Sequence, residues 1–239
     1  MFQKVILPFL LAVALLAGVS ASFGQANRFE KQDAANVVPP TIVLDAGHGG
    51  EDGGAVSESG ILEKDLNLTI AKKLAALLQA NGLRVILTRT EDEMLYDKSA
   101  DYQGRKKSLD LAARRKIAEE TPNCIFVSIH MNSYPDVRED GLQVWYSPND
   151  PASKIIADTI QQKAQDLLQP ENDRQTKAAT SAIYLLHHLT LPAVLVECGF
   201  LSNPTEAELL NTPEYQEKLA LVLCLAITRV CRSAELFAA

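Results

Sequence analysis

The chain has 239 residues, 47% of them hydrophobic and 22% charged, which suits one globular domain and excludes a disordered tail. A formal net charge of −7 argues against a nucleic-acid-binding protein, because such proteins usually carry a basic face. No fixed internal period points to a repeat architecture.

The first 26 residues form a segment of their own. Lys4 is its only charge, and an apolar run from Val5 to Gly18 leads to small residues that end at Ala26. This order is typical of a secretory signal, with an uncleaved membrane anchor and a buried helix as the alternatives. We therefore expect a signal peptide or N-terminal anchor at 1–26, a polar leader at 27–40 and the functional domain at 41–235.

Export makes disulfides possible, but the cysteine spacing is not that of a disulfide framework. Cys224 and Cys231 lie two turns apart in one predicted helix, about 10 Å, which is beyond disulfide reach. Cys124 and Cys198 lie in apolar, strand-like runs. We expect all four thiols to be free and buried.

The body of the chain alternates predicted strands and helices. Short β-branched and apolar runs predict strands at 41–46, 83–88, 124–129, 142–146 and 193–196. Apolar residues at helical spacing predict helices at 63–80, 105–120 and 151–168, and a last helix that begins at Pro213. This alternation predicts the α/β class, a single domain whose sheet has helices on both faces.

Three of the predicted strands lead directly into a residue that can bind metal or exchange protons. His48, His130 and Glu197 follow the first, third and last strands, and Glu63 begins the first helix. In open α/β sheets, sites form beyond the carboxyl ends of the strands, so these side chains can converge. Two histidines and one carboxylate are typical of a catalytic zinc site, which leaves the second carboxylate free to act as a base.

Structural roles are the alternative for each of these residues. A strand-end histidine is more often a hydrogen-bonded structural residue, and these candidates are too far apart in the chain for a local zinc motif. The adjacent His187 and His188 are interpreted as surface or packing residues, with substrate contact as the lesser alternative. The glycine-rich run at 47–50 does not match a phosphate-binding loop.

Five segments in a fixed order resemble the motifs of the zinc-dependent N-acetylmuramoyl-L-alanine amidases of the amidase-3 type. They are LDAGHGGEDGGA (44–55), LEKDLNL (62–68), TRTED (88–92), SIHMN (128–132) and VECGFLSNPTEAELL (196–210). The resemblance runs from about Thr41 to Arg229, and the compact layout is most similar to the germination-specific cortex amidases of spore-forming bacteria. It implies a twisted, mostly parallel sheet of about six strands and hydrolysis of the amide between N-acetylmuramic acid and L-alanine in peptidoglycan.

Matched motif by motif, the resemblance implies that Zn²⁺ is held by His48, Glu63 and His130 and that Glu197 is the catalytic base. Asn132, in SIHMN, is a weaker candidate for substrate contact. Family members often carry an arginine ahead of the last catalytic strand, where this chain offers Arg174 or Lys177. The acidic net charge does not favour capture of an acidic peptide stem, so zinc is expected to be the main positive charge of the site.

Other functions stay open at this point. Spore cortex maturation is the function that we expect. The alternatives are a vegetative cell-wall autolysin of the same chemistry, a zinc or magnesium hydrolase with another substrate, and a non-catalytic wall-binding module. We expect an extracytoplasmic protein, in the cell wall, the periplasm or the intermembrane space of the developing spore. The N-terminal segment could anchor the protein to a membrane. We expect no nucleic-acid partner, and the sequence does not indicate whether the protein has a protein partner.

Overall fold

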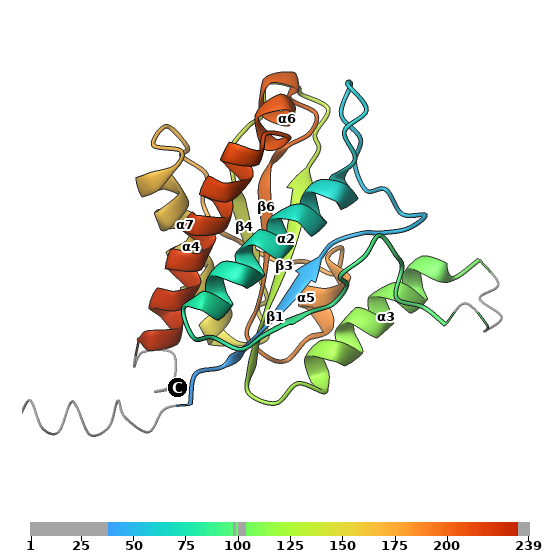
Figure 1. Ribbon diagram of the computed structural model, residues 1–239, viewed down its shortest axis with the longest axis vertical. Coiled ribbons are helices and arrows are strands. Elements are labelled where there is room, and N and C mark those ends of the chain that lie inside the picture. The colour runs from blue at the N-terminus through green and yellow to red at the C-terminus, as the bar shows by residue number, and fades with distance from the viewer. Residues whose placement is uncertain (1–37, 98, 100–103, 234–239) are drawn as a thin grey trace, which may run out of the picture. The chain divides into compact units, whose positions relative to one another are not determined.

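The computed structural model describes residues 38–97, 99 and 104–233 (Figure 1). The predicted signal or anchor at 1–26, nearly all of the leader and the predicted end of the domain at 235 lie outside the described residues. Within the described part of the chain, no helix is both long enough and apolar enough to cross a membrane.

Six strands form one mixed sheet in the order β2-β1-β3-β6-β4-β5. The strands are β1 (Thr41–Ala46), β2 (Val85–Leu87), β3 (Cys124–Asn132), β4 (Gln143–Tyr146), β5 (Lys177–Ala178) and β6 (Ala193–Phe200). The pairs β2–β1, β1–β3, β3–β6 and β4–β5 are parallel, and β4 runs antiparallel to β6. The expected α/β class, six strands and mostly parallel pairing are confirmed.

Helices cover both faces of the sheet, as predicted (Figure 1). They are α2 (Glu63–Ala80), α3 (Lys106–Glu119), α4 (Pro151–Leu167), α5 (Tyr184–His188), α6 (Pro204–Leu210) and α7 (Pro213–Arg232). Alternation along β1 separates two cores, because successive side chains of a strand point to opposite faces. Ile42 and Leu44 pack in the core formed with α2, α4 and α7, whereas Val43 packs in the core formed with α3 and α5.

The strands β3 and β6 are longer than their apolar runs predict. They continue to Asn132 and Phe200, so His130 and Glu197 lie within strands, not after them. The two strands stay paired through this region, where His130 is the register partner of Glu197. Hydrophobicity alone ends each strand too early, because the polar side chains there face a site and not solvent.

All four cysteines are buried with free thiols. Cys224 and Cys231 both lie in α7, in agreement with the predicted helix. The sequence pattern did not predict β5, α5 or α6, which have two, five and seven residues. Elements this short contain too few residues to show a helical or strand period.

Candidate functional site

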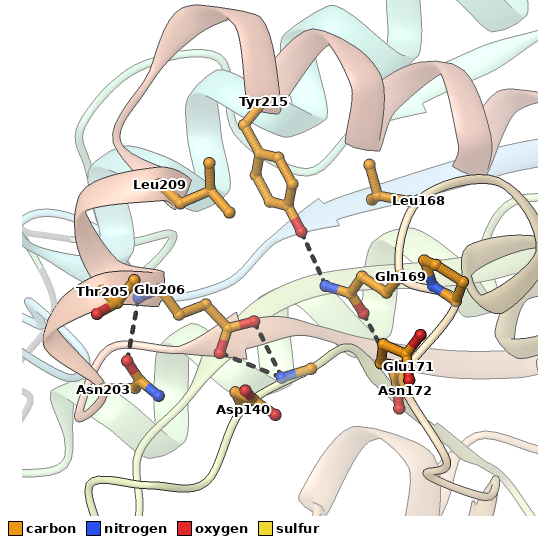
Figure 2. A pocket seen from close by; sticks show the side chains of 12 residues that line it. Asp140, Leu168, Gln169, Glu171, Asn172, Asn203, Thr205, Glu206, Leu209 and Tyr215 are labelled. Atoms are coloured by element: carbon orange, nitrogen blue, oxygen red, sulfur yellow. Dashed lines mark hydrogen bonds between the residues drawn. The ribbon is translucent and has the colours of Figure 1, made fainter.

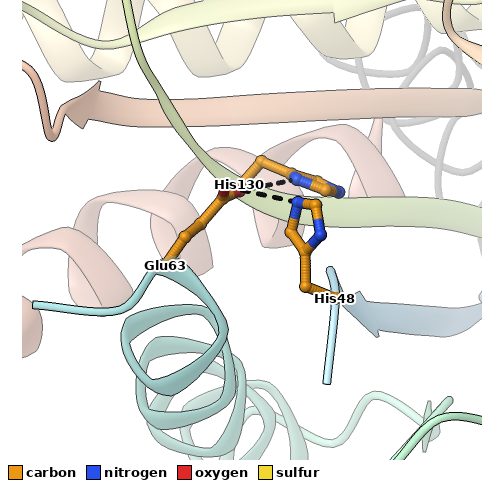
Figure 3. Close-up of side chains that lie close together, drawn as sticks. All are labelled: His48, Glu63 and His130. Carbon is orange, nitrogen blue, oxygen red and sulfur yellow. Dashed lines mark hydrogen bonds and ion pairs between the residues drawn. The ribbon is translucent and has the colours of Figure 1, made fainter. Parts of the chain in front are cut away.

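The three predicted metal ligands meet at one edge of the sheet (Figure 3). One donor atom from each of His48, Glu63 and His130 lies within 4.8 Å of the others. His130 Nδ1 is 2.8 Å from Glu63 Oε1, and His48 Nε2 is 3.3 Å from Glu63 Oε2. The structure therefore brings together residues that the sequence places on β3, at the start of α2 and just after β1.

The Glu63 carboxylate is buried and held by backbone groups from two segments. Oε1 accepts a hydrogen bond of 3.0 Å from Met131 N, and Oε2 accepts one of 2.8 Å from Ala55 N. Burial alone would raise the pKa of Glu63, but the hydrogen bonds and charges of His130 and His48 hold it well below its usual range. Glu63 is thus an anion at neutral pH, as a metal ligand must be.

Two glycines of the first motif leave room for the cluster. A Cβ at Gly47 would lie 2.2 Å from His130 Cε1, and a Cβ at Gly54 would lie 2.5 Å from Glu63 Oε2. Gly54 also has a φ of +70°, which L side chains rarely adopt. Gly47 and Gly54 are therefore required for close packing around His130 and Glu63.

Two buried arginines hold the turn that carries His48. Arg89 and Arg114 both donate to the Ala46 carbonyl, at 2.9 and 2.7 Å. Arg114 also donates to His48 O at 2.6 Å, and Arg89 donates to Lys64 O at 2.8 Å. These bonds stabilise the His48 backbone at its unusual φ of +60°. Sequence reasoning assigned no role to either arginine, although Arg89 lies in the TRTED motif.

Glu197 extends from β6 toward the same cluster. Its Oε2 atom is buried and has no hydrogen-bond partner within the described structure. Burial raises the pKa of Glu197 to about 7, the Glu63 charge adds to the rise, and His130 and His48 oppose it. The carboxylate lines a cavity of about 260 Å³ together with His48 and His130. It can therefore exchange a proton near neutral pH with a molecule bound in that cavity.

The residues present fit a bound metal ion. Two imidazoles and one ionised carboxylate are the ligand set of a catalytic zinc site with an open position. His48 Nδ1, the other nitrogen of that ring, lies 2.9 Å from Asp52 Oδ2, and such a carboxylate orients a metal-binding histidine. The cluster could thus hold a metal next to the unpartnered Glu197 oxygen.

The weaker candidates lie elsewhere. The Asn132 side-chain oxygen accepts a 2.8 Å hydrogen bond from Ser133 N, and Asn132 is not among the residues that line the cavity, so its role in substrate binding stays a prediction. His187 and His188 are exposed on α5, whose Tyr184 lines the cavity instead. Arg174 pairs with Glu139, outside the cavity lining.

A second cavity, of about 330 Å³, shares none of these lining residues (Figure 2). Its polar groups are paired with one another: Gly141 N donates to Glu206 Oε1 at 3.0 Å, and Gln169 Nε2 donates to Tyr215 OH at 2.8 Å. Glu206 also accepts a 2.7 Å bond from Phe200 N. This cavity therefore has a structural role, in which Glu206 fixes the end of β6 three residues after Glu197.

Comparison with known proteins assigns the family. The model of the family Amidase_3, N-acetylmuramoyl-L-alanine amidase, matches residues 42–229. The germination-specific N-acetylmuramoyl-L-alanine amidase of Bacillus subtilis strain 168 is 37% identical over 192 residues, which cover 79% of this chain and 78% of that protein.

Solved structures agree with this assignment. The CwlD amidase from Clostridioides difficile, solved in complex with the GerS lipoprotein, is 38% identical, with a TM-score of 0.75 over 80% of this chain and 98% of that one. The catalytic domain of CwlV from Bacillus (Paenibacillus) polymyxa var. colistinus is 32% identical, with a TM-score of 0.66 over 80% and 97% of the two chains. The chain belongs to the Amidase_3 family of N-acetylmuramoyl-L-alanine amidases.

Proposed function

We propose that the protein hydrolyses the amide bond between N-acetylmuramic acid and L-alanine in peptidoglycan, with zinc held by His48, Glu63 and His130. The observation that carries this proposal is the buried Glu197 Oε2 atom, which has no hydrogen-bond partner within the described structure and belongs to a side chain beside these three residues. Zinc, on which this family generally depends, would polarise the amide carbonyl and make water more acidic. A purely wall-binding module would gain nothing from a buried carboxylate that lacks a partner, since such a group costs stability.

Glu197 performs the proton transfers of this reaction. Burial raises the pKa of Glu197, so this carboxylate binds a proton more readily than an exposed glutamate and can accept one and then release it. The carboxylate takes a proton from the attacking water as the new C–O bond forms at the lactyl carbonyl carbon. It then gives this proton to the alanine nitrogen as the C–N bond breaks, which leaves a lactyl carboxylic acid, a free alanine amine and the original Glu197 carboxylate.

Product analysis on purified peptidoglycan tests the reaction. We expect new N-terminal alanine and no new reducing sugar ends after incubation with the purified protein. New reducing ends without N-terminal alanine would show a glycosidase and refute the proposal, and a different metal-dependent hydrolase would release neither product.

The Glu197→Gln variant tests the assigned role. The amide keeps the shape of the side chain but cannot accept the proton, so the rate should fall by about 10²–10⁴-fold while the zinc content stays near one per chain. Glu119→Gln, which changes an exposed carboxylate on α3, is the matched control and should keep full activity. A Glu197→Gln protein that lost its zinc would instead make Glu197 a metal ligand.

We also propose that the substrate is spore cortex and that the protein is exported through residues 1–26. The support is the similarity to a germination-specific amidase, and the alternative is a vegetative autolysin of the same chemistry. Mass spectrometry of spore muropeptides from cells that lack this protein should show loss of muramic lactam; normal spore muropeptides with altered vegetative wall would favour the autolysin.

N-terminal sequencing of the exported protein tests signal cleavage. Because the C. difficile relative was solved with a lipoprotein, affinity purification from sporulating cells is the corresponding test for a protein partner.

A further inference from the structure

One wall of the catalytic cavity is the face of α3 that carries Lys107. Residues 107, 110, 111 and 114, which share one side of a helix, line the cavity together with Glu197. The opposite wall is residues 182–185, at the start of α5, and both helices lie on the same face of the sheet (Figure 1). A molecule bound in this cavity therefore has Glu197 and Lys107 along the same walls.

Lys107 has hydrogen-bonding capacity left for a ligand. Its side chain is 67% exposed, and its Nζ atom is 3.4 Å from Asp52 Oδ2. Two neighbouring lysines, Lys64 and Lys106, are held more closely, at 2.7 and 2.6 Å from their carboxylate partners. The other cation of the cavity wall, Arg114, is buried in ion pairs with Asp45 and Asp110. An ammonium group has three donors, so Lys107 can bind a second anion without leaving Asp52.

The chemistry of the substrate places an anion at a suitable distance. The lactyl carboxyl is consumed in the cleaved amide, and the carboxyl of the alanine is consumed in the next peptide bond. The first free carboxylate of the stem therefore belongs to its second residue, a glutamate linked through its side chain. Lys107 Nζ and His48 Nδ1 lie 3.4 and 2.9 Å from the same oxygen of Asp52, so the ammonium lies within about 6 Å of Nδ1, the nitrogen of the His48 ring that does not contact Glu63. Two extended residues span roughly 7 Å, which suits this separation.

We propose that Lys107 is a specificity-determining residue that binds the α-carboxylate of the second stem residue. The inference rests on the proposed amidase function. Asp52 and Glu197 both face the cavity and would repel this carboxylate, and a charge-assisted hydrogen bond from Lys107 offsets that repulsion. The site thus has a positive group of its own besides a bound metal, where the sequence alone predicted zinc as the main positive charge.

Two soluble muramoyl-peptide substrates test this proposal with the full chain. One has a free α-carboxylate on the second residue, and the other has the same group amidated. We expect the protein to prefer the free acid by roughly twofold to fivefold in kcat/KM, mainly through a lower KM. In Lys107→Met this ratio should fall to about 1, and Lys107→Arg should restore it.

Lys116→Met is the matched control, because Lys116 lies on the same helix, is 71% exposed and does not line the cavity. It should keep the preference of the unmodified protein. Equal losses on both substrates in Lys107→Met would mean that Lys107 acts through Asp52 and His48 or through the fold, and would overturn the proposal. So would a protein that does not distinguish the two substrates.

A binding measurement distinguishes failure of this inference from failure of the proposed amidase function. Calorimetric titration of the two uncleaved ligands into the Glu197→Gln variant, with and without Lys107→Met, reports the carboxylate contact without any cleavage. If neither ligand is hydrolysed by the unmodified protein, the amidase proposal fails, while a Lys107-dependent difference in affinity still supports the contact. Equal affinities for both ligands would refute the contact even if hydrolysis is normal.

Discussion

Replacement of Arg114 by Met tests the idea that a buried guanidinium holds the catalytic edge in place. Arg114 is 1% exposed and donates to the Asp45 and Asp110 carboxylates and to the carbonyls of Ala46 and His48. Methionine fills much of the same volume but satisfies none of these acceptors. Asp45, which is fully buried, keeps only the hydroxyl donors of Ser128 and Thr88.

The expected cost is large because one partner of a buried ion pair is removed. Such losses amount to about 3–5 kcal/mol in the free energy of unfolding. For a domain of this size each kcal/mol lowers the melting temperature by about 2–4 °C, so we expect a decrease of roughly 6–20 °C. Arg115→Met is the matched control, since Arg115 is the next residue, is one-third exposed and pairs with Glu119. Because solvent screens this pair, the change should leave the free energy of unfolding nearly unchanged.

The pH dependence of this cost has a definite sign. Burial raises the pKa of Asp45, but the Arg114 charge and the Ser128 hydrogen bond outweigh it and hold the pKa below its usual value. In the unmodified protein Asp45 therefore stabilises the fold above about pH 4, and this contribution is lost as the pH falls through the lowered pKa. Without Arg114, burial raises the pKa above that of the unfolded chain, so the variant loses stability as the pH increases. The difference between the two proteins should be largest at neutral pH and should shrink toward pH 4.

Urea unfolding at pH 7, 5.5 and 4.5, followed by circular dichroism, measures these differences for both arginine variants. Equal, small costs for Arg114→Met and Arg115→Met would refute the assigned role of Arg114. A large cost that did not change with pH would show that lost packing, and not the buried charge that Asp45 carries without its ion-pair partner, causes the destabilisation.

Two further predictions concern the metal cluster. Gly47→Ala places a Cβ 2.2 Å from the His130 ring and should lower zinc affinity at least tenfold in a chelator competition. Gly53→Ala is the control and should keep its zinc affinity, because its Cβ would lie 3.6 Å from the nearest neighbouring atom. Equal zinc affinities of the two variants would refute the packing argument. Chelation of the metal should lower the melting temperature, because a ligand at 100 times its Kd stabilises the fold by about 2.7 kcal/mol, or roughly 5–11 °C for this domain. The Glu197→Gln variant should still show this decrease in melting temperature on chelation, and the Glu63→Gln variant should not. The reverse result would make Glu197 the metal ligand and Glu63 the base.

The sequence predicted the residues of the site better than the residues that support it. His48, His130 and Glu197 became candidates because each lies at the end of an apolar run, and Glu63 because it begins the first predicted helix. The motifs then supplied the expected role of each residue. Arg114 and Arg115 are adjacent and chemically identical, so nothing local marks the first as buried and the second as one-third exposed. The difference arises because Arg114 meets Asp45, which lies 69 residues earlier on β1. Hydrophobic periodicity cannot predict an ion pair between residues so far apart in the chain, and it assigns both arginines to the surface.

The structure also explains why the candidate ligands converge on this edge of the sheet. β1, β3 and β6 are parallel neighbours, so their carboxyl ends point the same way, and the register that pairs His130 with Glu197 places a predicted ligand beside the predicted base. β4 runs antiparallel to β6, so the residue next to Glu197 is Gln143, at the amino end of β4. A neutral amide beside Glu197 adds no further charge to a carboxylate that burial already holds near a pKa of 7. The antiparallel β4 thus places no further acid beside Glu197, and Lys107 on α3 is the exposed cation along the cavity wall.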